Sequence, residues 1–404
     1  MLGGGLADCA FAQQAAAPAN GPAVTDVSDD GRAQYPAFLA DSYVSLNIGY
    51  IDYPFSSRQL EPGHVVASVD VPHLAVQAVL FGHHFGKYLS AQGTYMRPIE
   101  YVRYNDVNGP GNSHTAWMHF GTATLLGRVP LNPRLSVYGE GGIAITSRRG
   151  FEIAGAPIVK NAHFTSLLLG AGVEYQASRT TDFVFGLAYV PANASWNQPR
   201  MTFGSAGVRF NMRKLPADKV RETLEAGFRF PANLLQVGYS TNALGYGANN
   251  LVSNKMRIFW GGHVEVGRSL ASINYQRNLF HTKKVFSIDV GGSVSHWESN
   301  SQEQRFTTLS VYPVLRFTAV RTKAADYYAF YSVAGPTYIS REIIDGLDTG
   351  GRFTFQDFMG VGAFIGANRR FNVELNLNHY SNGNILQENA GVKIPLTFKV
   401  GLTF

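Results

Sequence analysis

The chain has 404 residues, of which 45% are hydrophobic and only 15% charged. Its 43 glycines, 27 phenylalanines and 20 tyrosines favour β-structure with many turns. No run of about 18 apolar residues is present, which excludes a transmembrane helix. Two classes remain: a soluble all-β protein, and an outer-membrane barrel, whose strands are only half apolar.

The formal net charge of +6 does not point to a nucleic-acid partner. Lys and Arg do not cluster but are spread among expected turns, which also fits a barrel beside anionic lipopolysaccharide. Cys9 is the single cysteine and cannot form an intramolecular disulfide.

The N-terminus contains an A-x-A cleavage pattern, Ala10-Phe11-Ala12 followed by Gln13. A positively charged n-region and a long apolar core are missing. We expect residues 1–12 to be a signal-peptide remnant, with a plain unstructured tail as the alternative. Residues 13–40 are rich in Ala, Pro, Gly and Asp and are expected to be disordered.

Residues 41–212 contain strands of about ten residues that alternate between apolar and polar positions. The expected strands are "SYVSLNIGYIDYPF", "HLAVQAVLFGHHF", "KYLSAQGTYMRPIEYVRY", "HTAWMHFGTATLLGRV", "RLSVYGEGGIAIT", "HFTSLLLGAGVEYQAS", "DFVFGLAYV" and "RMTFGSAGVRFNM". Short connections at 132–134 and 178–182 alternate with longer loops, "NDVNGPGNS" and "SRRGFEIAGAPIVKN". This pattern predicts an all-β, eight-stranded, antiparallel up-and-down transmembrane barrel.

Residues 213–233 interrupt the pattern and are expected to form a periplasmic linker, with Val220 and Leu224 at helical spacing. From 234 to 404 the alternation resumes, with eight or nine strands; eight is favoured because single-chain barrels normally have an even number. The apolar register of the last strand ends at Phe404, as in bacterial outer-membrane proteins. Two tandem barrels are favoured over a single barrel of about sixteen strands.

In "FNVELNLNHYS" (371–381), His379 and Ser381 continue the apolar register of the strand. Residues two apart on a strand point to the same side, with Cα atoms about 6.5 Å apart. A histidine can therefore take the proton of the serine as it attacks an acyl carbon. On a lipid-facing register this chemistry suits an acyl ester in the membrane. The alternative is that "HYSN" is the polar end of a strand leaving the bilayer.

The second half resembles the lipid A 3-O-deacylase (PagL) family of outer-membrane acyl hydrolases. The resemblance is carried by "HYSNGN" (379–384), "NAGV" (389–392) and "FTFQDFMGVGAF" (353–364), and covers under half of the chain. It implies an eight-stranded barrel that hydrolyses the 3-O acyl ester of lipid A. Ser381 would be the nucleophile and His379 the base, and backbone N–H groups around Asn382 and Asn384 would bind the oxyanion.

The sequence departs from the family at the third catalytic position. Where the family has a glutamate that orients the histidine, this chain has Lys393, which cannot accept the imidazole N–H. Glu388, in the loop after His379, and Asp357, on the preceding strand, are the two candidates for a replacement.

Two functions follow from these observations. The first is an outer-membrane carboxylic ester hydrolase whose partner is lipid A or lipopolysaccharide. The alternative is a catalytically inactive structural or adhesive outer-membrane barrel. We expect no cofactor and no metal, since His83-His84 and the pair His114/His119 lack a completing ligand pattern.

Overall fold

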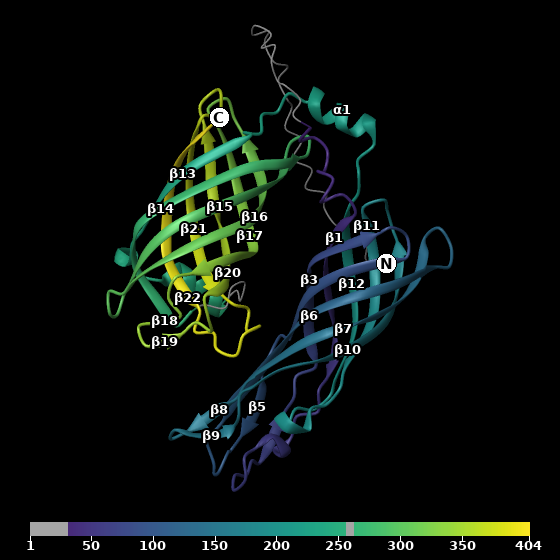
Figure 1. Ribbon diagram of the computed structural model, residues 1–404, viewed down its shortest axis with the longest axis vertical. Helices are drawn as coiled ribbons and strands as arrows, with labels where there is room; N and C mark the ends of the chain where they lie inside the picture. Colours follow the sequence, from purple (N-terminus) through teal and green to yellow (C-terminus); the bar gives the residue numbers. More distant parts are fainter. Residues whose placement is uncertain (1–30, 256–261) are drawn as a thin grey trace, which may run out of the picture.

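The computed structural model describes residues 31–255 and 262–404. It consists of two β-barrels joined by a linker (Figure 1). The expected signal-peptide remnant, residues 1–12, lies outside the described residues. Within them, no helix is long and apolar enough to span a membrane.

The first barrel is closed by eight antiparallel strands, each paired with its neighbour in sequence, and β1 pairs with β12. The strands are β1 (Ser42–Asp52), β3 (Leu74–Phe85), β4 (Leu89–Pro98), β6 (His114–Pro130), β7 (Leu135–Arg149), β10 (Ala162–Gln176), β11 (Thr181–Val190) and β12 (Met201–Met212). All eight correspond to strands expected from the alternation.

The long connections of the first barrel carry extra structure that the sequence did not suggest. The expected strand through Tyr104 is two strands, because β4 ends at Pro98 and β5 (Val102–Asn105) pairs with β2 (Ser68–Asp70). The expected loop at 147–161 holds the end of β7 and a hairpin, β8 (Phe151–Ile153) and β9 (Ala156–Val159). Two short 3-10 helices complete these connections, η1 (Ser57–Gln59) and η2 (Ala194–Trp196).

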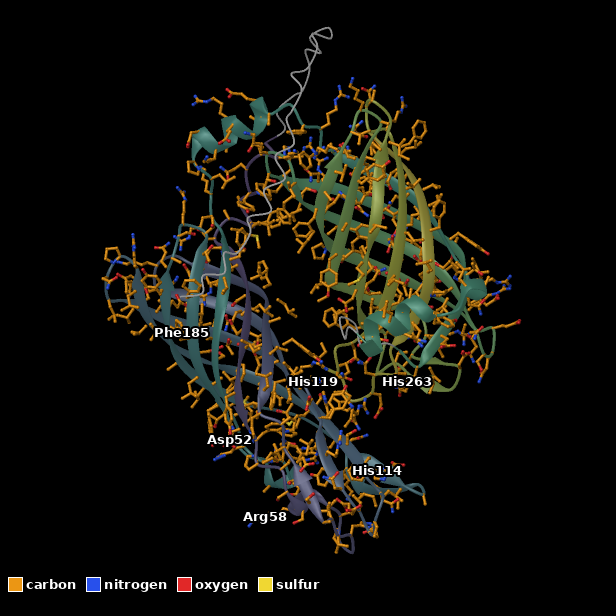
Figure 2. The ribbon with its side chains drawn as sticks, turned by 180° about the vertical axis from the view of Figure 1, so that it is seen from behind. Asp52, Arg58, His114, His119, Phe185 and His263 are labelled. Atoms are coloured by element: carbon orange, nitrogen blue, oxygen red, sulfur yellow. The ribbon has the colours of Figure 1, made fainter. Side chains whose placement is uncertain are left out.

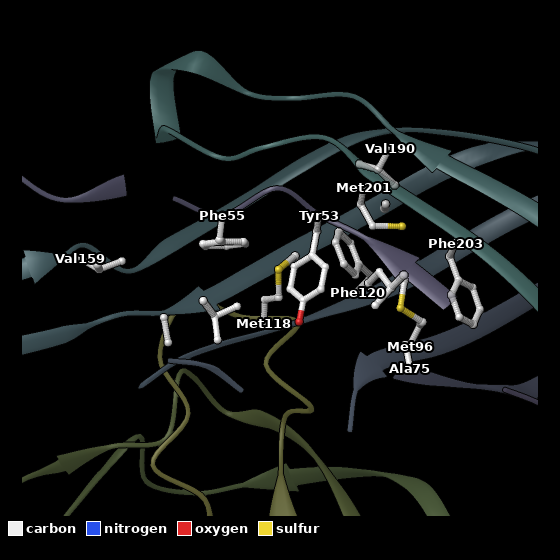
Figure 3. Close-up of a cluster of buried hydrophobic side chains, with 14 of the residues drawn as sticks. Tyr53, Phe55, Ala75, Met96, Met118, Phe120, Val159, Val190, Met201 and Phe203 are labelled. Atoms are coloured by element: carbon white, nitrogen blue, oxygen red, sulfur yellow. The ribbon is translucent and has the colours of Figure 1, made fainter. Parts of the chain in front are cut away.

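A hydrophobic cluster explains why this extension is ordered beyond the barrel. Tyr53, Phe55, Met118 and Phe120 are buried there against Val159 of β9 (Figure 3). Inward residues of β6 thus leave the polar lumen and enter an apolar core, which lets the strands continue as a packed sheet.

The linker contains α1 (Ala217–Glu225), which is solvent-exposed and ion-paired to the second barrel through Glu222 and Lys283. Residues 13–40 are expected to be disordered; 13–30 lie outside the described residues, and 31–40 form turns instead. Tyr35 stacks on Phe280 with ring centroids 3.9 Å apart, and Arg32 donates to Asn278 Oδ1 at 3.1 Å. The start of the first barrel is therefore packed against the second.

The second barrel is also closed by eight antiparallel strands, and β13 pairs with β22. The strands are β13 (Asn233–Ser240), β14 (Val264–His281), β15 (Phe286–Ser299), β16 (Arg305–Arg321), β17 (Ala325–Ile339), β20 (Phe353–Ile365), β21 (Phe371–Ser381) and β22 (Val392–Thr403). Two eight-stranded barrels are thus confirmed, and the alternative of one sixteen-stranded barrel is wrong. The connections carry η3 (Asn242–Leu244), α2 (Gly247–Asn250), η4 (Leu251–Lys255), β18 (Ile343–Ile344) and β19 (Leu347–Asp348).

Both barrels have apolar outer surfaces and polar interiors, as the alternation requires. On β21, for example, Leu375 is exposed while its neighbours Glu374 and Asn376 are buried in the lumen. The long connections of both barrels lie at one end, opposite α1 (Figure 1). We call this the outer end, because long loops face outward in bacterial outer-membrane barrels.

Candidate active site

His379 and Ser381 lie at the outer end of β21, on the outward-facing register of the second barrel. The neighbouring strand β20 places Asp357 directly opposite His379, and Phe355 opposite Ser381. Side chains of directly opposite residues point to the same face. The sheet therefore brings Asp357, His379 and Ser381 together on one outward patch.

Asp357 is the carboxylate nearest the imidazole. Its Oδ2 lies 3.9 Å from His379 Nδ1, which is longer than a hydrogen bond. Its Oδ1 accepts a 2.6 Å hydrogen bond from the backbone N–H of Ala334. Ala334 sits at a bulge of β17 with a φ of 53°, which aims this N–H at the carboxylate. The bulge thus holds Asp357 beside the histidine.

Glu388 has a different partner. Its Oε2 is ion-paired to Nη1 of Arg149, from the first barrel, at 3.2 Å. Of the two carboxylates proposed from sequence, the structure brings Asp357 to His379 and commits Glu388 to Arg149.

Lys393, at the position of the family's glutamate, is opposite His379 on β22. Its ammonium is directed to the other side, where Nζ is 3.1 Å from Oε1 of Glu265 on β14. Four charged or titratable residues therefore form a row across four strands: Asp357, His379, Lys393 and Glu265. The acid next to the imidazole is on the opposite flank from the family position, and the lysine charge is neutralised by Glu265.

Two donors point at Ser381 Oγ. Ser381 Oγ accepts a hydrogen bond from Asn389 Nδ2 at 2.8 Å and from the backbone N–H of Gly383 at 3.2 Å. Sequence reasoning gave Asn389 no role, although it opens the quoted "NAGV" motif. The presence of Asn389 in that motif was therefore the signal from which its role could have been predicted.

Asn382 and Asn384 shape the loop rather than face the serine oxygen. Asn382 is fully buried, and its Nδ2 donates to the carbonyls of Thr349 at 2.9 Å and Glu388 at 2.6 Å. Its backbone N–H, which we expected to bind the oxyanion, donates to Asn389 Oδ1. Asn384 has a φ of 56° and accepts from Asn389 through Oδ1. The N–H directed at Ser381 is that of Gly383, which lies between them.

The site is at the junction of the two barrels. His379 is only 5% exposed, whereas Leu375 on the same register, nearer the bilayer centre, is 40% exposed. On the first barrel, outward-facing His119 is 1% exposed and lies on the flank facing the second barrel (Figure 2). Ser381 itself remains partly accessible.

Residues 270–396 match the family model for "Lipid A 3-O-deacylase (PagL)". The second half of the chain resembles PagL. Both barrels, with their apolar outer surfaces and filled polar interiors, are embedded in the bacterial outer membrane.

Solved structures similar to the chain include proteins of the outer membrane. The outer membrane enzyme PagL is 14% identical, with a TM-score of 0.30, covering 43% of this chain and 100% of that one. Neisserial surface protein A is 15% identical, with a TM-score of 0.28, covering 43% and 97%. The N-terminal barrel of Pseudomonas aeruginosa OprF is 12% identical, with a TM-score of 0.28, covering 43% and 98%. No curated protein matches the chain.

The second barrel gathers a hydroxyl, an imidazole and a carboxylate on one outward patch. Across residues 31–255 and 262–404, no group of three His, Cys, Asp or Glu side chains is arranged to hold a metal ion. A nucleophile, a base, a carboxylate and two N–H donors are what an ester hydrolase uses.

Proposed function

We propose that the protein is an outer-membrane ester hydrolase that removes the 3-O-linked acyl chain of lipid A. The observation that carries this proposal is the outward-facing cluster of Asp357, His379 and Ser381 at the outer end of a PagL-like barrel. An outward site meets lipid, and lipopolysaccharide is a lipid whose acyl esters lie at this depth of the outer leaflet.

In the first half of the reaction, Ser381 Oγ attacks the acyl carbonyl carbon while His379 takes the hydroxyl proton. A C–O bond forms between serine and acyl chain. The ester bond to the sugar then breaks, and the imidazolium returns its proton to the departing 3-hydroxyl oxygen. Asp357 stabilises the imidazolium and orients the ring, with the 3.9 Å separation shortening as charge develops.

In the second half, His379 deprotonates a water molecule that attacks the acyl-serine. The products are a free fatty acid and the regenerated hydroxyl of Ser381. The carbonyl oxygen becomes an oxyanion in both halves. The donors that already point at Ser381, Gly383 N–H and Asn389 Nδ2, are placed to stabilise that charge.

The test is mass spectrometry of lipid A from cells that produce the wild type or Ser381→Ala. We expect the wild type to yield lipid A lacking one acyl chain, with fragmentation placing the loss at the 3-O position, and the variant to leave lipid A intact. Identical lipid A from both strains would contradict the proposal and favour an inactive structural or adhesive barrel. Loss of an acyl chain from another position would support the hydrolase function and change only the ester bond that is assigned as its substrate.

A further inference from the structure

The loop that carries the catalytic donors, residues 382–391, is held by the first barrel as well as by its own. We call it the catalytic loop. Three polar contacts from the outward face of β7 hold it, and β6 packs against it. Arg149 pairs with Glu388 at 3.2 Å and donates through Nη2 to the carbonyl of Gln387 at 2.9 Å. Ser147 Oγ donates to the carbonyl of Asn384 at 2.6 Å.

The strand β6 contributes a packing contact with the catalytic loop. At Gly121 the strand has no side chain, and a Cβ there would lie 3.2 Å from Cγ2 of Ile385. The glycine thus leaves the space that Ile385 occupies, so the two surfaces fit by shape as well as by hydrogen bonding.

Polar residues on this face are unusual for a barrel wall. Trp117, His119 and Gly121 on β6 lie opposite Arg149, Ser147 and Ile145 on β7, all on the register that elsewhere meets lipid. A charged or polar side chain on a lipid-facing register is costly unless it is paired. Here the catalytic loop of the second barrel supplies the partners.

We propose that the first barrel is an intramolecular support for the active site, and that Arg149 and Ser147 are positioning residues for the catalytic loop. Both hold loop carbonyls beside Asn389 and Gly383, whose N–H donors face Ser381. Fixing donors before the reaction is what makes an oxyanion site effective. The inference deepens the proposed hydrolase function and rests on it.

Two perturbations with matched controls test the support. Arg149→Ala removes both loop contacts of that residue, and Gly121→Leu forces Ile385 away. Arg200→Ala breaks a comparable ion pair of the same barrel, to Asp52 at 3.0 Å, away from the loop. Gly127→Leu adds the same side chain on the same face of β6, where nothing lies within 4 Å.

With purified full-length protein and lipid A in micelles, we expect Arg149→Ala and Gly121→Leu each to lower kcat about tenfold or more, with KM little changed. The arginine variant loses its loop contacts, and the leucine variant displaces Ile385. Both controls should keep the wild-type rate. Ile385→Ala should restore activity to Gly121→Leu, because it vacates the space that the new side chain fills.

Hydrogen exchange of loop amides 383–388 gives a readout that does not need activity. We expect faster exchange in Arg149→Ala and Gly121→Leu than in their controls. Wild-type kcat and unchanged exchange in both, with Ser381→Ala inactive, would overturn the support role and leave the hydrolase standing. A wild type without deacylase activity would defeat the proposed function instead, and exchange would still decide whether the first barrel holds the loop.

Discussion

At the scale of single residues, the two carboxylates proposed as the orienting acid differ in the groups that they contact. Asp357 is opposite His379 and is anchored by the Ala334 N–H, whereas Glu388 is bound to Arg149. A carboxylate beside the imidazole stabilises the positive charge that forms during proton transfer. Asp357 is therefore the residue whose charge matters most for His379.

We expect Asp357→Asn to lower kcat by at least about 10²-fold, towards the roughly 10⁴-fold loss seen when a triad hydrolase loses its acid charge. The asparagine oxygen still accepts from the Ala334 N–H, so the local fold is kept while the charge is lost. Steady-state kinetics on lipid A measures the effect.

Glu388→Gln is the matched comparison. The amide oxygen still accepts from Arg149, and the residue does not touch the imidazole, so the loss should stay below about tenfold. Equal losses in Asp357→Asn and Glu388→Gln would mean that the assignment of the acid is wrong.

At the scale of elements, the catalytic loop depends on the connection between β19 and β20. Ala390 N–H donates to the Asp348 carbonyl at 2.9 Å, and Asn382 Nδ2 reaches the Thr349 carbonyl. Gly350 lies between them and the loop with a φ of 89°, and a Cβ there would be 1.8 Å from the Glu388 carbonyl oxygen. Only glycine permits so close an approach of two backbones.

Gly350→Ala should therefore displace the catalytic loop and lower kcat about tenfold or more, while the barrel stays folded. Gly346→Ala is the control, since Gly346 also has a positive φ, 78°, but has open space around it. Kinetics and circular dichroism of both variants check the expectation. A similar loss of kcat in Gly346→Ala would trace the effect to backbone strain rather than to the loop contact.

At the scale of the whole molecule, each barrel interior contains buried ion pairs, Arg209–Glu174 in the first and Arg316–Asp289 in the second. In the second barrel, Arg316 is ion-paired to Asp289 and donates to Gln276 Oε1 at 2.7 Å, with Glu374 at 3.9 Å. Asp289 is 1% exposed, so it depends on this arginine for compensation.

Arg316→Ala should lower the free energy of unfolding by about 3–5 kcal/mol, because it leaves a buried carboxylate unpaired. Arg277→Ala on β14 removes an exposed arginine that donates to Asn233 Oδ1, and should cost less than about 1 kcal/mol. Urea unfolding followed by tryptophan fluorescence compares the two. Equal midpoints would show that the lumen charges do not contribute to stability.

Alternation along the strands was enough to predict both barrels, because the period of two follows directly from one lipid-facing and one lumen-facing side. The same alternation placed His379 and Ser381 outward. The alternation could not decide which carboxylate lies beside His379, because the position of Asp357 opposite His379 depends on the register between β20 and β21. Nor could it assign Asn389, whose contact with Ser381 depends on the fold of a ten-residue loop.

The contact between the barrels was beyond sequence reasoning for a different reason. His119, Ser147 and Arg149 interrupt an otherwise apolar outward register, and alone they resemble the polar rim of a strand end. The partners of Ser147 and Arg149 lie more than 200 residues away in the chain, on a loop of the other barrel.

The linker through α1 gives this contact a property that two separate proteins would lack. Because both barrels are one polypeptide, their meeting is a unimolecular event with a fixed one-to-one ratio. The fraction of molecules with a supported catalytic loop is then independent of how much protein the membrane holds. Activity should therefore rise in simple proportion to expression level, without the threshold that assembly from dilute partners would impose.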